Sequence, residues 1–456
     1  MRAFRHVPSP ALGRIVQSHS PPPTWHTFAT LSCAETARTP SSRRGRGGVP
    51  RRQTAHGQAV AAARTFIRDA KPANTAPSSR AAPRFAFAFD IDGVLLHVAK
   101  PIPGATEALR YLQRHDIPFI LLTNGGGKHE RERVEDLSNR LGVPLSTDNF
   151  VQSHTPFQEL VDRSWDPSHV DGKSGLADKN ILITGSDAAK SRLIAEAYGF
   201  RSVITPADIL AAHPDIFPFE QLLKSHYAAT ARPLPSPNPK IDAIFVFNDP
   251  RDWALDTQII LDLLLSRGGV LGTYSPNNGR PAHGHDNDGW QGDGQPDLYF
   301  SNHDLFWSAG YHLPRLGQGA FQAALAGVWR QVTGGAELRR ATIGKPYART
   351  YGYAERVLAQ WRAGLLRRNG DVSADAGAGA EAPALDRVYM VGDNPESDIR
   401  GANEYASPRG TEWASVLVRT GVWSRDRDGE PKYRPSAIVD DVKGAVEWAL
   451  EREGWR

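Results

Sequence analysis

From residue 85 onward, short apolar runs alternate along the chain with stretches whose apolar residues have helical spacing. The segment 104–115, "GATEALRYLQRH", has this spacing and lies between the first two runs. Continuous apolar runs separated by helices predict a parallel β-sheet with helices on both faces, because such strands are buried on both sides. The expected fold class is therefore α/β with a Rossmann-like parallel sheet. The predicted strands are "FAFAF" (85–89), "PFILLT" (118–123), "NILITG" (180–185), "AIFVF" (243–247), "RVYMVGD" (387–393) and "SVLVRTG" (415–421).

Polar residues follow several of these runs at the point where each strand is predicted to end. In parallel sheets, ligands bind beyond the carboxyl ends of the strands. Asp90 and Asp92 follow the first run within an Asp-x-Asp-Gly pattern, which recurs at 286–289 and 426–429. Only the first copy follows a buried-strand pattern, and the other two are predicted to be polar turns. The first copy is therefore the candidate for chemistry.

Two further segments indicate phosphate binding. Thr123 and Asn124 run into the triple glycine 125–127, and a hydroxyl next to exposed backbone N–H groups forms a natural phosphate cradle. Lys345 lies in "TIGKPY", where Pro346 disfavours helical geometry and leaves the lysine free to reach into a site as a point charge.

The segment "VGDNPESDIRGA" predicts an acidic corner between a strand and a helix. Asn394 is a good N-cap and Pro395 a good first helical residue, which places Asp393 and Asp398 at the same corner. Together with Asp90 and Asp92 this makes four carboxylates, which repel one another unless a cation lies among them. Hard oxygen ligands and the absence of thiolates favour Mg²⁺. An aspartate can then attack phosphorus, and a second carboxyl can act as general acid and base.

These motifs resemble those of the haloacid-dehalogenase-superfamily phosphohydrolases. The four family motifs occur in order as "DIDGVLL", "LLTN", the lysine of "GKP", and "GDNPESD". "PIPGATEALRYL" (101–112) resembles the class IIA subgroup, which has a large α/β cap inserted between the second and third motifs. "DPRDWALD", "LPRLGQGAF" and "GKPYARTYGYAE" are similar to segments of the cat-eye-syndrome-critical-region family of mitochondrial members.

The resemblance implies roles for individual residues. Asp90 would be the nucleophile and Asp92 the general acid and base. Mg²⁺ would be held by Asp90, the backbone carbonyl of Asp92, and Asp393. The remaining residues implied are Thr123, Asn124 and Lys345 for binding phosphate, and Asp398 and Asn394 as supporting residues.

The implied function is Mg²⁺-dependent hydrolysis of a small phosphorylated metabolite, a phosphomonoester, through an aspartyl-phosphate intermediate. Two alternatives stay open: a phosphotransferase that uses an alcohol acceptor, and a non-catalytic mitochondrial binding protein that keeps the fold. Homodimer formation is also left open. One departure from the family is "TNGGG", where related phosphatases have Thr-Asn-Asn, so this loop is expected to treat the substrate differently.

Four segments are expected along the chain. Residues 1–84 would form a disordered segment like a transit peptide, residues 85–177 and 316–456 the hydrolase core, and residues 178–315 the inserted α/β cap. The cap would close over the site and select the substrate. Two places are open to its tryptophans, Trp253 and Trp307: the core of the cap, which is the favoured expectation, and the wall of a substrate pocket.

The charge of the chain is unevenly distributed. Residues 1–84 hold 14 Lys and Arg against two acidic residues, a net charge of +12, whereas the remaining residues hold 40 basic and 48 acidic ones, a net charge of −8. A basic, Ser-rich, acid-poor N-terminus is typical of mitochondrial import, and the alternative is a cytoplasmic protein with a basic tail. The acidic remainder argues against nucleic-acid binding. No apolar run has the length of a membrane span.

Overall fold

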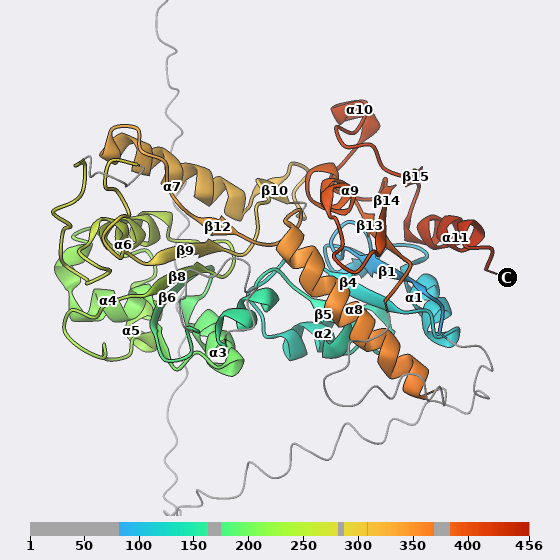
Figure 1. Ribbon diagram of the computed structural model, residues 1–456, viewed down its shortest axis with the longest axis horizontal. Coiled ribbons are helices and arrows are strands. Elements are labelled where there is room, and N and C mark those ends of the chain that lie inside the picture. Colours follow the sequence, from blue (N-terminus) through green and yellow to red (C-terminus); the bar gives the residue numbers. More distant parts are fainter. Residues whose placement is uncertain (1–81, 163–174, 281–286, 308, 369–383, 456) are drawn as a thin grey trace, which may run out of the picture. The chain divides into compact units, whose positions relative to one another are not determined.

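The computed structural model describes residues 82–162, 175–280, 287–307, 309–368 and 384–455 (Figure 1). The predicted transit-peptide-like segment 1–84 lies outside the described residues except for its last three. Within the described part of the chain, no helix is both long and apolar enough to cross a membrane.

The first sheet contains the strand that carries the Asp-x-Asp pattern. Among the described residues it has six strands, all parallel, in the order β15-β14-β13-β1-β4-β5. The central strand β1 pairs with β13 from Phe85 opposite Arg387 to Phe89 opposite Val391. The six strands are β1 Phe85–Phe89, β4 Phe119–Leu122, β5 Phe150–Val151, β13 Arg387–Gly392, β14 Glu412–Val418 and β15 Ala437–Val439.

The alternation of phenylalanine and alanine in β1 matches the two faces of this sheet. Phe85, Phe87 and Phe89 pack on the face covered by α1, α2 and α11, whereas Ala86 and Ala88 face α8 and α9. Successive side chains of a strand point to opposite faces, so the small residues leave room for the long helix α8. The helices around this sheet are α1 Ala105–Arg114, α2 Glu130–Leu141, α8 Ala348–Arg368, α9 Arg400–Glu404 and α11 Val442–Arg452.

A second parallel sheet lies in the region inserted after β5. Its order among the described residues is β12-β9-β8-β6-β7. Helices α4 to α7 cover one face, and α3 with the turn 155–160 covers the other. The elements are β6 Asn180–Thr184, α3 Ala188–Tyr198, β7 Ser202–Ile204, α4 Pro206–Ala212, α5 Lys224–Thr230, β8 Ala243–Val246, α6 Trp253–Leu265, β9 Asp297–Phe300, α7 Gln318–Thr333 and β12 Ala341–Thr342. We call residues 180–342 the second-sheet region.

The second-sheet region extends further along the chain than the sequence predicted. The expected boundary at 315/316 differs from the structure, because α7 packs Phe321, Leu325 and Trp329 into the core of the second sheet. β12 then pairs with β9. The chain therefore returns to the first sheet only after β12.

Two short hairpins complete the described fold. The hairpins are β2 Leu96–His97 with β3 Lys100–Pro101, and β10 Phe306–Trp307 with β11 Arg315–Leu316.

Three further expectations from the sequence differ from the structure. The strand predicted at 415–421 starts and ends three residues earlier, at 412–418. The segment expected to be a polar turn at 426–429 includes most of a short helix, α10 Arg425–Asp428. Trp253 packs against Phe321 as expected, but Trp307 is 41% exposed.

Candidate active site

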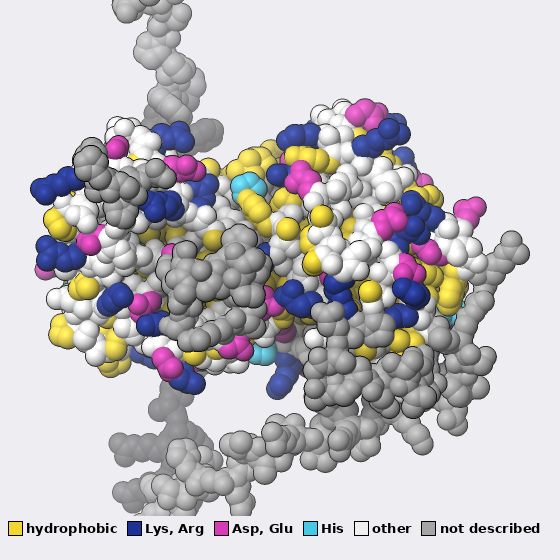
Figure 2. Space-filling model, viewed as in Figure 1, with side chains coloured by type: hydrophobic (Ala, Val, Ile, Leu, Met, Phe, Trp, Pro, Cys, Tyr) yellow, Lys and Arg dark blue, Asp and Glu magenta, His cyan; other side chains and the backbone are white. Residues whose placement is uncertain are grey.

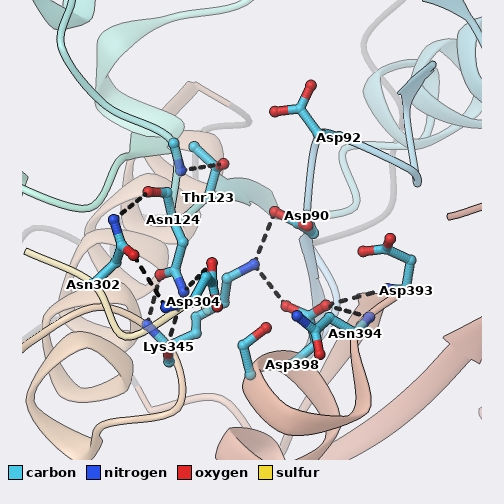
Figure 3. Close-up of polar contacts among 12 residues, drawn as sticks. Asp90, Asp92, Thr123, Asn124, Asn302, Asp304, Lys345, Asp393, Asn394 and Asp398 are labelled. Carbon is cyan, nitrogen blue, oxygen red and sulfur yellow. Dashed lines mark hydrogen bonds and ion pairs between the residues drawn. The ribbon is translucent and has the colours of Figure 1, made fainter. Parts of the chain in front are cut away.

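An ion-paired cluster lies where the two sheets contribute residues to one place. Asp90 follows β1 and Asp393 follows β13, both at carboxyl ends of the first sheet, whereas Lys345 follows β12 of the second sheet. The Lys345 Nζ lies 2.8 Å from Asp90 Oδ1 and 2.6 Å from Asp398 Oδ1 (Figure 3). Only 1% of the lysine side chain is exposed. The fold thus brings together four residues that the sequence separates by up to about 300 positions.

The charges of this cluster do not balance. Burial opposes the charge of Lys345, but Asp398 and Asp90 together raise its pKa above the ordinary value for lysine. Burial raises the pKa of Asp398 to about 6, although Lys345 acts in the opposite direction. Burial, followed by the charges of Asp90 and Asp398, raises the pKa of Asp393 well above its usual range. One lysine therefore faces three crowded carboxyl groups, and a further cation would relieve the repulsion.

Three carboxylates of the cluster lie close enough together to share a metal ion. Asp90, Asp393 and Asp398 each offer a ligand atom, and these atoms lie within 4.8 Å of one another. An all-oxygen set of this kind fits a hard divalent cation. It differs from the predicted ligand set by including Asp398, which at the same time holds Lys345.

The corner at 393–398 is held by backbone hydrogen bonds. Asn394 caps the π-helical turn Pro395–Ile399 by accepting a hydrogen bond from the Glu396 N–H, as the sequence predicted. Asp398 Oδ2 accepts from the N–H groups of Asp393 and Asn394 at 3.1 and 3.0 Å. Asp393 Oδ2 accepts from the Val422 N–H at 2.6 Å. These contacts fix two carboxylates in place before any ligand binds.

Glycine is required beside Asp393. At Gly93, where φ is +89°, a Cβ atom would lie 2.4 Å from Asp393 Oδ2. At Gly421 it would lie only 1.8 Å from the same oxygen. The glycine of the Asp-x-Asp-Gly pattern therefore serves both the turn and the close approach of a second strand end.

Asp92 lies apart from the ion-paired cluster. Its carboxylate is separate from the Lys345–Asp398 pair in Figure 3, and 46% of its side chain is exposed. The nearest cation is Arg133, whose Nη2 lies 4.0 Å from Asp92 Oδ2. Burial, followed by the charge of Asp90, raises the pKa of Asp92, and the side chain lines the cavity. A raised pKa suits a group that donates a proton.

Thr123 and Asn124 have different surroundings. The Thr123 hydroxyl accepts a hydrogen bond from the Gly125 N–H at 3.0 Å and lines the cavity. Asn124 instead brackets the backbone of Lys345, accepting from its N–H at 2.7 Å and donating to its carbonyl at 2.9 Å. Its amide also donates to Asp304 at 2.9 Å. The side chain of Asn124 thus differs from the predicted phosphate ligand, because both amide hydrogens are already donated within the protein.

The triple glycine lies against strand ends of both sheets, since Asn248 follows β8 of the second sheet and Ser153 follows β5 of the first. A Cβ at Gly127 would lie 2.2 Å from the Asn248 amide, and one at Gly126 would lie 2.7 Å from Ser153 Oγ. Asn248 in turn donates to the Ser186 hydroxyl. The departure from Thr-Asn-Asn therefore allows the second-sheet region to approach the loop closely.

A cavity of about 380 Å³ lies over this cluster and takes side chains from both sheets. This volume is in the range of sites for small molecules. Three cations line it in addition to Lys345: Lys128, Arg133 and Arg251. Its other lining residues include Asp90, Asp92, Val98, Thr123, Asn248, Asp304, Phe306, Trp307 and Asp393.

Sequence reasoning missed Asn302 and Asp304. Asn302 donates to the Asn124 carbonyl at 3.2 Å and accepts from the Asp304 N–H at 3.1 Å. Burial raises the pKa of Asp304 to about 7, although the hydrogen bond from Asn124 and the charge of Lys345 lower it. The available signal was the polar segment "SNHD" (301–304) directly after "DLYF", the sequence of β9, which the Gly/Asp-rich stretch before it obscured.

Comparisons with known proteins agree with the motifs. The family model described as haloacid dehalogenase-like hydrolase matches residues 87–201, and a second, described as HAD-hydrolase-like, matches residues 342–445. Together they span Asp90, Thr123, Lys345 and Asp393, but not most of the second-sheet region.

Relatives of known name match most of the chain. A mitochondrial hydrolase of Saccharomyces cerevisiae is 38% identical over 375 residues, which is 81% of this chain and 96% of that protein. A cardiolipin synthase (CMP-forming)/mitochondrial hydrolase fusion protein of Schizosaccharomyces pombe is 39% identical over 80% of this chain, which spans about half (53%) of the fusion protein. Among solved structures, the p-nitrophenyl phosphatase from Archaeoglobus fulgidus is 15% identical, with a TM-score of 0.46, covering 80% of this chain and 99% of that one. The chain belongs to the haloacid dehalogenase-like hydrolases.

Proposed function

We propose that the protein is a Mg²⁺-dependent phosphatase that hydrolyses a phosphomonoester through an aspartyl-phosphate on Asp90. The observation that carries this proposal is the buried ion-paired cluster of Lys345 with Asp90 and Asp398, with Asp393 beside them. A carboxylate nucleophile next to a fixed cation and a metal-type ligand set is suited to phosphoryl transfer, in which catalysis is mostly positioning and charge neutralisation.

The proposed reaction has two steps. A carboxylate oxygen of Asp90 attacks phosphorus, the bond from phosphorus to the substrate oxygen breaks, and Asp92 gives its proton to the departing alcohol. A water molecule then attacks the same phosphorus and gives a proton to Asp92, and the bond to Asp90 breaks. Free phosphate leaves and both aspartates return to their starting states. Lys345 and Thr123 would hold phosphoryl oxygens during both steps.

The all-oxygen donor set of Asp90, Asp393 and Asp398 fits a hard divalent cation. Asp90 and Asp393 would hold Mg²⁺, with Asp398 supporting, and the ion would neutralise charge on the transferring phosphoryl group. The chain's own residues would orient the reacting groups, since the backbone bonds to Asp393 and Asp398 keep both carboxylates in place.

The proposal is tested by phosphate release from a panel of phosphomonoesters, with the metal supplied and then removed by a chelator. We expect release that depends on Mg²⁺ and that falls at least about 1,000-fold in Asp90→Asn. Asp440→Asn is the control, because that side chain is 88% exposed and lies outside the cavity. Added glycerol distinguishes hydrolysis from transfer to an alcohol. Undiminished release by Asp90→Asn would exclude the covalent step.

We also propose a mitochondrial location. The names of the two relatives described above include mitochondrial hydrolase, and residues 1–84 carry the net charge of +12. A fluorescent reporter fused to residues 1–84 should enter mitochondria, and a reporter that stays in the cytosol would contradict the proposal. Because one relative is joined to a cardiolipin synthase, phosphorylated lipids and their headgroups belong in the first substrate panel.

A further inference from the structure

The hairpin at the mouth of the cavity exposes an unusual number of apolar side chains. Its described residues, 305–307 and 309–316, carry six large apolar side chains that are 41–54% exposed. These six, which we call the apolar rim, are Leu305, Phe306, Trp307, Tyr311, Leu313 and Leu316. In Figure 2, hydrophobic side chains gather on the surface over the position that Figure 1 labels β10. Contiguous exposed apolar surface of this kind marks a contact site.

The apolar rim is continuous with the catalytic cavity. Phe306 and Trp307 line the cavity as well as facing solvent. The hairpin is anchored next to the site, since the Gly317 N–H donates to the Leu305 carbonyl and the Gly319 N–H donates to the Asp304 carbonyl. An apolar group in contact with the rim would thus lie a short distance from a phosphoryl group held over Asp90.

A second apolar residue faces the same cavity from the first-sheet side. Val98, in the turn between β2 and β3, lines the cavity and is 56% exposed. Its φ is +60°, a left-handed conformation that costs more for a β-branched residue than for glycine or asparagine. A merely structural turn would favour one of those smaller residues, so an exposed valine here points to a contact made by its side chain.

The charge of the hairpin identifies the class of partner. Residues 305–316 contain Arg315 and His312 and no acidic residue. The Arg315 guanidinium lies over the Tyr311 ring, 4.6 Å from its centre. Tryptophan, tyrosine and arginine beside exposed leucines are the composition of segments that lie in the interface of an anionic membrane.

A second copy of the chain fits this surface less well. Stable protein interfaces bury about 800 Å² on each partner and use roughly 20–30 residues a side, more than this hairpin offers. Paired hairpins would also bring together two copies of Arg315 with no carboxylate of their own to pair them.

We infer that the apolar rim binds the surface of an anionic membrane, and that the cavity takes its phosphomonoester from a lipid in that surface. The part of the inference that concerns the substrate rests on the proposed function. Arg315 would contact lipid phosphates, and the cations that line the cavity, Lys128, Arg133 and Arg251, would attract the anionic headgroup. After hydrolysis the lipid alcohol stays in the membrane and phosphate leaves through water.

Membrane contact is tested on the full-length chain with a fluorophore that responds to polarity. Cys33 is the only cysteine, so Cys33→Ser combined with Leu313→Cys gives one labelling position in the hairpin. Cys33→Ser with Leu193→Cys is the matched control, because Leu193 is 58% exposed on α3. With phosphatidylcholine vesicles that contain phosphatidylglycerol, we expect the label at position 313 to shift to the blue and the label at 193 to stay unchanged. The basic N-terminal segment is present in both proteins and therefore cannot account for a difference.

Turnover is tested separately with phosphatidic acid in the same vesicles and with soluble glycerol 3-phosphate. Leu313→Asp should lower the rate on vesicles at least about tenfold, because a carboxylate in the interface is repelled by anionic lipid, and Leu193→Asp should not. The inference would be overturned if vesicles left the emission of the label at position 313 unchanged while the protein turned over a soluble phosphomonoester at the normal rate. So would a concentration-dependent dimer that Leu313→Asp dissociates without any effect on vesicles. A blue shift without hydrolysis of any substrate would support membrane binding by the apolar rim and refute the proposed function.

Discussion

The two sheets share an architecture but differ in the chemistry at their carboxyl ends. Both are parallel and both are covered by helices on two faces. The first sheet ends in the carboxylates Asp90 and Asp393. Neutral polar residues follow β6, β8 and β9 of the second sheet, namely Ser186, Asn248 and Asn302, and charged residues stand further along the loops after β8 and β9, namely Asp249, Arg251 and Asp304. The cation that pairs with the carboxylates of the first sheet, Lys345, follows the edge strand β12.

This difference shows that the fold determines where a site can form, at the carboxyl ends of the strands, and that the side chains there determine its chemistry. The first sheet provides the groups proposed to react. The second sheet provides the lysine that pairs with them and amides that hold the loops near them.

Removing the cation that the second sheet provides should have the largest effect. Lys345→Met leaves Asp90 and Asp398 buried without their shared partner, which should cost roughly 3–5 kcal/mol of stability at neutral pH. Turnover should fall about 100- to 1,000-fold, because a preorganised charge is lost from the site. Thermal unfolding and kcat measure the two effects. Lys443→Met, which alters an exposed lysine, is the control. Near-normal turnover would show that the first sheet acts without the second.

Separating the triple-glycine loop from the second sheet should have the next largest effect. Gly127→Ala places a methyl group 2.2 Å from the Asn248 amide at a residue with φ of +89°, so the loop must shift. We expect a loss of about 1–3 kcal/mol in stability and about tenfold in kcat/KM. Gly327→Ala is the control, since open space surrounds that residue of α7 and alanine favours helix. Unchanged kinetics in Gly127→Ala would mean that the close approach has no role in turnover.

Weakening the link through Asp304 should have a smaller effect. Asp304→Ala removes the acceptor for the Asn124 amide, whereas Asp304→Asn keeps an oxygen in the same place. We expect kcat to fall several-fold in the alanine variant and to recover most of that loss in the asparagine variant, because Asn124 also holds the backbone of Lys345. Steady-state rates at saturating substrate provide the measurement. Equal losses in both variants would assign the effect to the charge of Asp304 and not to its hydrogen bond.

A buried carboxyl group on a helix of the second-sheet region should affect stability and not turnover. Burial, followed by the charge of Asp252, raises the pKa of Asp256 on α6 to about 7. The folded state then holds a proton that the unfolded state has lost, so this group's contribution to stability declines as pH rises toward its folded pKa. Between about pH 5 and pH 8 we expect the melting temperature of the wild type to fall several degrees more than that of Asp256→Asn. Asp440→Asn should follow the wild type. Parallel curves for Asp256→Asn and the wild type would show that Asp256 has an ordinary pKa.

The parts of the fold that could be predicted are those with a local signal. β1, β4, β6, β8 and β13 are apolar on both faces, and a continuous apolar run expresses that burial directly. β12 has two residues and no periodicity. The apolar side of α7 fits either sheet, so its assignment depends on tertiary packing, and the boundary predicted at 315/316 was wrong for that reason.

The residues of the site can likewise be divided into those that have a local sequence signal and those that depend on tertiary contacts. Asp90, Thr123, Lys345 and Asp393 stand in motifs that the sequence displays, and the structure brings them to one cavity, although their roles remain predictions. The polar segment after β9 could be seen in the sequence, but the position of Asp304 at the site could not, because it depends on Asn124, which lies 180 positions away in the chain. The side chain of Asn124 was assigned to phosphate because a sequence cannot show that its amide is already used by a neighbouring loop.

The short edge strand β12 decides how this protein can be recombined with its relatives. A chimera that exchanges residues 178–315 would separate α7 from the sheet it covers and expose Phe321, Leu325 and Trp329. Crossover points before β6 and between Thr342 and Lys345 keep α7 with its own sheet and leave the lysine with the recipient's carboxylates. Grafts made at those points would transfer the cavity walls that the second-sheet region provides while the reacting groups stay native. Chimeric libraries made to alter substrate preference should therefore use these two crossover points.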